Sequence, residues 1–349
     1  MLVKIADSSV VVQAASKPIH AHMLSDCDAC PRKAFMRHVL NIRPVYEKPS
    51  EALDIGSLVH LMMDERYRGT AEDEAFRAGG RACDTRIGGL HAASEKGYVD
   101  PSDLEKLVLQ TERAFTLAKV IVRIFWKQYP LSGDLQPEAH EATLTATGHG
   151  FDVEGRLDLA LRSGEGHVWV VDHKTSSDPP SETSVGMLWD NQKLLYEWLA
   201  RAKWGEAFRG FIFNYIQKPT IRYCNKDADF DAYVTRCEEW YANQAERPIA
   251  SYAVRATGDQ PSLELLRKLS QYHQRIIEPT CESPFVIDPH TVRLDDIPRV
   301  RRACSPFRGR PCTYLPFCEQ PPSAWPSLWT HFTRGWADGE QGKGQEEGE

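Results

Sequence analysis

Residues 150–174 constrain the fold more than any other stretch of this chain. Apolar side chains recur at alternate positions over 151–161, which predicts a β-strand with one buried face. A run of β-branched and aromatic residues over 167–174 predicts a second strand. A glycine-containing turn at 163–166 separates the two runs, so together they predict a β-hairpin. Asp158 lies on the opposite face of the first strand from the apolar residues.

Three charged side chains converge if this hairpin forms. Asp172 and Lys174 are two residues apart and share a strand face, and a pairing that brings Asp158 to it gathers two carboxylates and an ammonium. Two close carboxylates repel each other unless a cation lies between them. Oxygen ligands of this kind suit Mg²⁺ or Mn²⁺, and a nearby lysine can hold a phosphate oxygen. Two carboxylates, a divalent cation and a lysine together suit phosphodiester hydrolysis. The alternative is a surface hairpin with a solvated Asp–Lys pair.

Two short segments of the hairpin carry a family resemblance. Residues 155–158 (GRLD) and 170–175 (VVDHKT) resemble the PD-(D/E)XK nuclease superfamily and, within it, the RecB-like exonucleases. The resemblance implies an α/β fold with a restriction-endonuclease-like core, in which helices flank a mixed central sheet. It also implies that Asp158 and Asp172 are metal-binding acids and that Lys174 is the catalytic lysine of the family.

A helix expected over 51–67 extends the resemblance. Its Gly56-x-x-x-His60 pattern resembles the G-x-x-x-H motif of the family, in which the histidine joins the two acids on the metal. The resemblance implies that His60 and the carbonyl of His173 complete the metal ligands. A lone helical histidine is otherwise more often a polar residue at the edge of the core.

Two further polar residues match the family. A helix opening at Ser184 places Gln192 in an apolar stripe, which is costly unless the side chain finds a partner. Gln192-x-x-x-Tyr196 resembles the Q-x-x-x-Y motif that lies over the active site and contacts substrate; the alternative is a core-edge glutamine bonded to backbone. Glu141, in a strand expected over 138–147, lies near the supporting glutamate of the family. It would touch a second metal or hold a lysine, and we favour the structural role.

The cysteines form two groups. The total of nine is odd, which argues against a disulfide framework. Cys304, Cys312 and Cys318 lie close together among prolines and aromatic residues, a setting that suits either zinc or an iron–sulfur cluster. Far upstream, Cys27-x-x-Cys30 is compatible with a metal half-site, a redox pair or two small buried residues.

The two cysteine groups also resemble parts of one family motif. The segment 30–35 (CPRKAF) resembles the opening of RecB-like nucleases that carry an iron–sulfur cluster. Cys312-x₅-Cys318 resembles the C-terminal cluster motif of AddB-type nuclease domains and of CRISPR-associated RecB-like exonucleases. The resemblance implies a 4Fe–4S cluster on Cys30, Cys304, Cys312 and Cys318 that clasps the N- and C-terminal segments together. The seven residues between Cys304 and Cys312 depart from the usual C-x-x-C spacing, and Cys27 is an alternative to Cys30 or Cys304.

Composition limits the class of protein. The 349 residues carry a net charge of −7, which argues against a generally basic DNA-coating protein but leaves local DNA-binding surfaces open. No apolar run approaches the ~20 residues of a membrane span, and the N-terminus lacks the apolar core of a signal peptide. We therefore expect a cytoplasmic protein with no membrane partner.

We predict a single RecB-like nuclease domain over 1–336 with its core at about 138–224. The helical and cysteine-bearing parts then occupy 21–130 and 225–336. The glycine-rich stretch 69–100 predicts a flexible insertion or loop, and 337–349 a disordered tail. The remaining patterns predict a helix that opens at Ser25 with the pattern Ser25-x-x-Asp28, helices over 101–129, 227–246 and 261–277, and strands over 209–217 and 220–224.

The function implied by the resemblance is that of a metal-dependent DNA exonuclease. It would act on single-stranded DNA or duplex ends, in recombination, repair or phage DNA metabolism. The alternative, from another class, is a non-catalytic DNA-binding subunit that retains the nuclease fold.

Overall fold

The structure is a computed structural model. It describes residues 5–6, 9–10, 18–44, 46, 50–130, 134–224, 226–256, 261–277, 297, 299–300, 304, 312–320 and 332–334. The chain divides into two compact units, which we name the terminal unit (1–47, 147–154 and 262–349) and the sheet unit (48–146 and 155–261). The single domain expected over 1–336 stays a prediction, and the tail at 337–349 lies outside the described residues.

Five strands form the central sheet in the order β4-β5-β6-β7-β8. β5 and β6 pair antiparallel, β6 and β7 parallel, and β7 and β8 antiparallel, so the sheet is mixed. β6 is apolar on nearly every residue up to Asp172, as expected for a strand that is covered on both faces. The strands are β4 (Leu135–Gly148), β5 (Phe151–Ser163), β6 (Val168–Ser176), β7 (Phe208–Gln217) and β8 (Ile249–Arg255).

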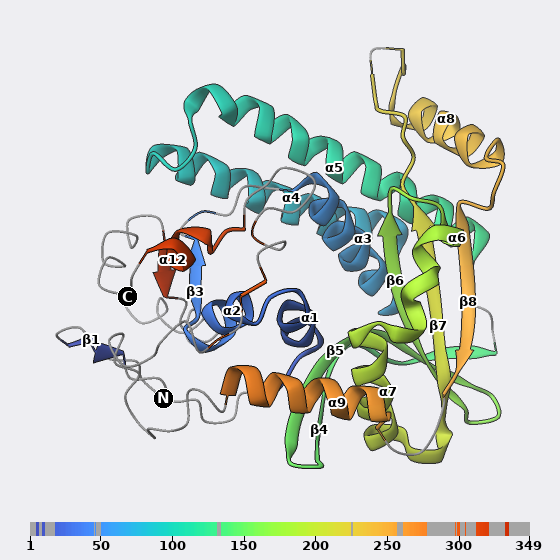
Figure 1. Ribbon diagram of the computed structural model, residues 1–349. Helices are drawn as coiled ribbons and strands as arrows, with labels where there is room; N and C mark the ends of the chain where they lie inside the picture. Colours follow the sequence, from blue (N-terminus) through green and yellow to red (C-terminus); the bar gives the residue numbers. More distant parts are fainter. Residues whose placement is uncertain are drawn as a thin grey trace, which may run out of the picture. The chain divides into compact units, whose positions relative to one another are not determined.

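Three long helices of the sheet unit pack together: α3 (Glu51–Tyr67), α4 (Glu72–Glu95) and α5 (Pro101–Gln128) (Figure 1). The helices expected over 51–67 and 101–129 are confirmed. The flexible insertion expected over 69–100 is wrong, because most of that stretch forms α4. A Cβ on Gly79 would lie 2.9 Å from side-chain atoms of both Met62 and Phe115. Glycine at this position lets α4 approach its two neighbours closely, and such packing outweighs the low helix propensity of glycine.

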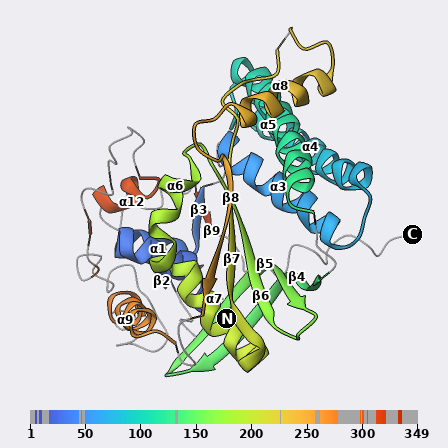
Figure 2. The same cartoon turned by 90° about the vertical axis from the view of Figure 1, so that its right-hand side faces the viewer.

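The sheet lies between helices on its two faces, as Figure 2 shows. The ring of His173 on β6 packs against Tyr67 of α3 and Phe125 of α5. Lys174, the next residue, reaches Gln192 of α7 (Asn191–Trp204) on the other face. The expected α/β fold with helices flanking a mixed sheet is therefore confirmed.

Three expectations for the second half of the sheet unit need correction. The long α-helix does not start at Ser184. Residues 180–189 form α6 (Pro180–Thr183) and a 3₁₀ helix (Ser184–Trp189), and Asp190 caps α7. The strand expected over 220–224 is wrong, since these residues form no ladder after β7. The strand that does pair with β7 is β8, which the sequence patterns missed. The helical spacing over 227–246 is confirmed by α8 (Phe230–Ala242).

The described part of the terminal unit is mainly helical. Ser25 does not open a helix: α1 begins at Ala21, and Ser25 Oγ donates to the Ala21 carbonyl at 3.1 Å from inside it. The extended backbone of Cys30 separates α1 from α2. The elements are β1 (Ile5–Ala6), β2 (Ser9–Val10), α1 (Ala21–Ala29), α2 (Pro31–Ala34), a π-helix (Phe35–Val39), β3 (Ile42–Pro44), α9 (Leu263–Tyr272), a π-helix (His273–Ile277), α12 (Leu315–Glu319) and β9 (Phe332–Arg334). The helix expected over 261–277 is confirmed.

None of the described helices combines the length and the apolar character that a bilayer crossing requires.

Candidate active site

The hairpin of β5 and β6 brings the two predicted acids together. The two strands are antiparallel and pair Leu159 with Val171. Asp158 and Asp172 are the next residues along each strand, so they lie across from each other. The backbone N–H of His173 donates to Oδ2 of Asp158 at 2.9 Å, which fixes this carboxylate against β6. Both acids are almost wholly buried as side chains, with 14% of Asp158 and 5% of Asp172 exposed. The geometry of the predicted hairpin is thus present.

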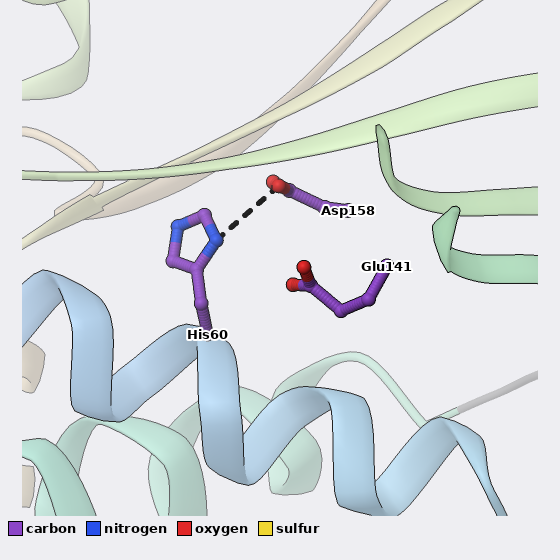
Figure 3. Close-up of side chains that lie close together, drawn as sticks. All are labelled: His60, Glu141 and Asp158. Carbon is purple, nitrogen blue, oxygen red and sulfur yellow. Dashed lines mark ion pairs between the residues drawn. The ribbon is translucent and has the colours of Figure 1, made fainter. Parts of the chain in front are cut away.

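His60 on α3 points at this pair of strands. Its Nδ1 lies 3.3 Å from Oδ1 of Asp158, and its Nε2 lies 2.7 Å from the carbonyl oxygen of His173 (Figure 3). Burial would lower the pKa of His60, but the hydrogen bond and charge of Asp158, with the charge of Asp172, raise it to about 9. His60 is therefore an imidazolium at neutral pH, and both its N–H groups face acceptors.

Glu141 on β4 completes a compact acidic group. A ring nitrogen of His60 and one carboxylate oxygen each of Glu141 and Asp158 lie within 4.8 Å of one another, the only such group of three or more His, Cys, Asp or Glu among the described residues. Figure 3 shows the three side chains pointing toward a common centre. Arg156 donates a hydrogen bond to Glu141. The φ of Glu141 is +45°, in the left-handed region that few non-glycine residues adopt, so strand β4 is locally kinked where this carboxylate leaves it.

Asp172, Lys174 and Gln192 form a second group beside the first. Gln192 Oε1 accepts a hydrogen bond from Lys174 Nζ at 2.8 Å, and its Nε2 donates to Oδ1 of Asp172 at 3.1 Å. Lys174 Nζ also lies 2.8 Å from Oδ2 of Asp172 in an ion pair, so one ammonium contacts both Asp172 and Gln192. Gln192 therefore has the partners that a glutamine on a largely apolar helix requires.

The surroundings shift the pKa values of Asp158 and Asp172 in opposite directions. Burial alone would raise the pKa of Asp158, but the hydrogen bond and charge of His60, with His173, outweigh it and lower that pKa. Burial and the charge of Asp158 raise the pKa of Asp172, against the pull of Lys174. Burial would lower the pKa of Lys174, but Asp172 raises it above the ordinary value, so the side chain is an ammonium at neutral pH.

His173 contributes its backbone to the site and its side chain to the core. His173 is only 2% exposed, and this burial lowers the pKa of its imidazole to about 4. Tyr67 Oη and Asn214 Nδ2 lie 2.8 and 3.2 Å from its two ring nitrogens. The neutral ring thus anchors β6, while the N–H and carbonyl of the same residue contact Asp158 and His60.

Tyr196 lies one helical turn after Gln192 and supports the sheet. Its hydroxyl donates to the carbonyl of Arg156 on β5, and the residue is 9% exposed. A Cβ on Gly155 would lie 2.5 Å from Tyr196 Cε1 and 2.8 Å from Leu199 Cδ1, so this glycine lets α7 approach β5.

The acidic group has the properties that a divalent cation needs. It offers a histidine nitrogen and carboxylate oxygens at one point, and the buried Asp172 carboxylate lies on the neighbouring strand of the same hairpin. The charges of His60 and Lys174 offset these acids in the structure. Oxygen-rich sites of this kind fit Mg²⁺ or Mn²⁺ better than softer metals.

The structure places the carboxylate of Glu141 beside His60 and Asp158, where Arg156 also contacts it. Both the metal-binding and the structural role expected for Glu141 stay predictions. The direction of this side chain depends on the +45° φ in the middle of β4, which no periodicity reveals. Asp64, one helical turn after His60, was missed by the sequence patterns; its Oδ1 lies 2.7 Å from Nδ1 of His140, the neighbour of Glu141.

The four cysteines of the predicted cluster lie in the terminal unit, where Cys30 and Cys304 act electrostatically on the thiols of Cys312 and Cys318. The N–H of Cys312 donates to the Cys304 carbonyl at 2.9 Å, and Arg299 Nε donates to Cys304 Sγ at 3.3 Å. Burial raises the pKa of the Cys318 thiol to about 11, and the thiols of Cys30 and Cys304 add to this rise. In the described part of the chain, no three of these sulfur atoms lie within 4.8 Å of one another.

Comparison with known proteins yields one family and two solved structures. A family model described as "PD-(D/E)XK nuclease superfamily" matches residues 21–318. A "Putative exonuclease" from Eubacterium rectale is similar at 13% identity and a TM-score of 0.39, covering 87% of this chain and 93% of its own. The protein SSO0001 is similar at 17% identity and a TM-score of 0.20, covering 65% and 87%. At these TM-scores neither structure enters the argument. Among curated proteins, none matches the sequence.

Proposed function

The chain belongs to the PD-(D/E)XK nuclease superfamily, and from this premise we propose that it is a metal-dependent DNA exonuclease. It hydrolyses phosphodiester bonds of single-stranded DNA or of duplex ends, in recombination, repair or phage DNA metabolism. The observation that carries the proposal is the convergence of His60, Glu141 and Asp158 beside the Asp172–Lys174–Gln192 group.

His60, Asp158, Asp172 and the His173 carbonyl hold the divalent cation in this proposal, with Glu141 as a further ligand. When bound, Mg²⁺ or Mn²⁺ would offset the negative charge of the acids and of the phosphodiester. His60 would hold the cation as a neutral imidazole, because a metal-bound histidine nitrogen must be unprotonated. The repulsion between the buried Asp172 and Asp158, which a cation would relieve, supports the role of Asp172 as a ligand.

Lys174 acts as a hydrogen-bond donor and not as a proton acceptor. Asp172 keeps the pKa of Lys174 above its ordinary value. At neutral pH Lys174 is therefore an ammonium without a free lone pair. It orients the attacking water or holds a phosphate oxygen, where positive charge stabilises the transition state. Gln192 positions this ammonium through the hydrogen bond at 2.8 Å, and Tyr196 places α7, to which Gln192 belongs, against β5.

Linear and circular DNA test the exonuclease against its rivals. The wild-type chain should degrade end-labelled linear single strands or duplex ends with Mg²⁺ or Mn²⁺, and leave closed circular DNA intact. Cleavage of circles would contradict exonuclease action. DNA binding without cleavage under any of these conditions would instead favour a non-catalytic subunit that keeps the fold, although the complete set of acids and lysine argues against such a decayed site.

We further propose that Cys30, Cys304, Cys312 and Cys318 hold a 4Fe–4S cluster. The mutual influence of their thiols supports a shared ligand. One zinc ion bound at ~2.3 Å by each sulfur would bring the sulfur atoms closer together than 4.8 Å. In a cluster each cysteine binds a different iron, which fits a wider spacing of the sulfurs.

The colour and metal content of anaerobically purified protein test the cluster. Wild type, Cys83→Ala and Cys237→Ala should contain iron and absorb visible light, whereas Cys312→Ala should be colourless and poorly soluble. The reason is that a centre that binds only the folded chain adds its binding free energy to stability. Stoichiometric zinc without iron in the wild type would contradict the cluster.

A further inference from the structure

A cavity of about 300 Å³ opens in the sheet unit, at a different place from the acidic group. Its walls come from the start of α3, the middle of α5, the end of β6, the loop after β7 and the start of α8. Three cations, Arg113, Lys218 and Arg222, and two aromatic residues, Tyr223 and Tyr233, line it. A volume of this size accepts a group as large as one nucleotide.

The three cations lack close counter-ions in the described part of the chain. Salt bridges within 4.0 Å are present for many other lysines and arginines, but none involves Arg113, Lys218 or Arg222. Burial lowers the pKa of Lys218, although the charges of Glu51 and Asp178 oppose the shift. An ammonium that has lost part of its hydration gains from an anion such as phosphate.

The aromatic part of the cavity is fixed on one side and open on the other. Tyr233 is buried and its hydroxyl donates to the Ile221 carbonyl at 3.1 Å. Tyr223 stands edge-on to Tyr233, with ring centroids 5.4 Å apart, and keeps 42% of its surface exposed. Ile55 and Leu117 add an apolar wall. A ring with one supported edge and a free surface beside cations suits stacking of a nucleobase.

The cavity and the proposed active site lie along the same pair of elements. Ala52 at the cavity and His60 at the acidic group are eight residues apart on α3, or ~12 Å along the helix axis. Between them α3 and β6 run close together, since a Cβ on Gly56 would lie 3.5 Å from Oγ1 of Thr175. The cavity and the acidic group therefore lie about two turns of α3 apart, a separation of a few nucleotides along a strand.

We propose that the cavity is a subsite for the substrate strand, which takes the base and phosphate of one nucleotide a few positions away from the cleaved bond. The base stacks on Tyr223, and the cations Lys218 and Arg222 hold the phosphate. The subsite rests on the proposed function, because it assigns the ligand of the cavity to the strand that the nuclease cleaves.

Binding of fluorescein-labelled oligothymidine to the full chain in EDTA, followed by anisotropy, tests the subsite without catalysis. Tyr223→Ala should raise Kd about tenfold, which is ~1.4 kcal/mol and within the range for base stacking. Tyr223→Phe should bind like wild type, since it keeps the ring. The matched control is Tyr98→Ala, because Tyr98 is similarly exposed (46%) and lies outside the cavity.

The salt dependence of binding isolates the phosphate contact. Lys218→Ala should reduce the slope of log K against log[salt] by about 0.7, as expected for one lost contact to a single strand. Lys127→Ala should leave the slope unchanged, because Lys127 is 71% exposed, pairs with Glu238 and lies outside the cavity.

The outcomes separate the subsite from the proposed function. Cleavage by wild type together with unchanged binding by Tyr223→Ala and Lys218→Ala would overturn the subsite alone. Tyr223-dependent binding without any cleavage would overturn the exonuclease and leave the subsite. Saturable, Tyr223-dependent binding of thymidine monophosphate with no effect of Tyr223→Ala on the oligonucleotide would overturn a strand subsite in favour of a free-nucleotide site.

Discussion

At the scale of single residues, the proposed centre works through carboxylates that have different neighbours. Asp158 accepts from His60 and from the His173 backbone, and its pKa is lowered. Asp172 is buried beside Asp158 and its pKa is raised, although the charges of Lys174 and His60 oppose the shift. A divalent cation would remove this repulsion, so the affinity for metal should depend on each acid separately.

Removal of one negative charge from the acidic group should weaken metal binding. We expect Asp158→Asn and Glu141→Gln each to raise the Kd for Mn²⁺ about tenfold or more, or ~1.4 kcal/mol, since each keeps the shape but loses a charged ligand. Calorimetry without DNA measures this directly. Glu138→Gln is the matched control, because Glu138 lies on the same strand and pairs with Arg162. Unchanged affinity in a variant would exclude that residue as a ligand.

Gln192 should matter through Lys174 and not through the metal. Gln192→Ala removes the acceptor of the ammonium and should lower kcat ~10-fold to ~10²-fold, the range expected when a catalytic group is misplaced by about 1 Å. Mn²⁺ affinity and KM should change little. Gln244→Ala, in which the lost side chain only bonds the Trp240 carbonyl, is the control. A collapsed thermal transition in place of a lower kcat would point to a purely structural role.

The structure brings together most of the residues that the sequence proposed for the site, because their spacing is local. The separations of Asp172 from Lys174 and of Gln192 from Tyr196 follow from strand and helix periodicity. The role of Glu141 was not accessible in this way, since it depends on a single left-handed residue and on the register of β4. The partners of the His173 ring, Tyr67 and Asn214, are likewise set by tertiary packing.

At the scale of elements, periodicity predicted α3 and α5 almost to the residue, because each carries a regular apolar stripe. It failed for α4, in which glycines suggested a loop although Gly79 is required for close packing against α3 and α5. It also missed β8, whose exposed residues alternate with partly buried ones at the edge of the sheet. Tertiary contacts decide such elements.

Gly155 should be essential for the contact between β5 and α7. Gly155→Ala places a Cβ 2.5 Å from Tyr196 Cε1, so the variant should lose about 1–3 kcal/mol of unfolding free energy through overpacking. Urea denaturation measures the loss. Gly89→Ala is the control, because nothing lies within 4 Å of its Cβ and alanine favours the helix interior by ~1 kcal/mol. Equal stability of Gly155→Ala and wild type would contradict this packing.

At the scale of the whole molecule, the titratable groups of the two units differ in kind. The sheet unit holds the acidic centre, whereas the terminal unit holds the four cysteines of the proposed cluster and a histidine cluster around Asp26. His22 lies between His20 and His38, stacked on His20 at a ring distance of 5.3 Å and tilted against His38 at 5.1 Å. Burial, and then the charges of His38, His20 and Arg37, lower its pKa to about 4, against the pull of Asp26.

This shift predicts a loss of stability in mild acid. The unfolded chain binds a proton at His22 near pH 6.5, whereas the folded chain does so only near pH 4. The contribution of His22 is therefore complete above about pH 6.5 and is lost as the pH falls toward about 4. Thermal midpoints at about pH 7.5 and about pH 5 should differ less in His22→Gln than in wild type.

The control for this experiment is His91→Gln, because His91 is exposed on α4 and outside the cluster. It should keep the full pH dependence of the wild type. An undiminished difference between the two midpoints in His22→Gln would contradict the assignment.

Single-turnover cleavage of an end-labelled DNA strand by wild type and Lys174→Ala tests the central claim most directly. We expect wild type to cleave with Mn²⁺ and to stop in EDTA. Lys174→Ala and Asp172→Ala should be at least ~10²-fold slower while still binding the strand, because each removes one positioned group of the centre. A rate near that of wild type in either variant, or cleavage that persists in EDTA, would contradict the account.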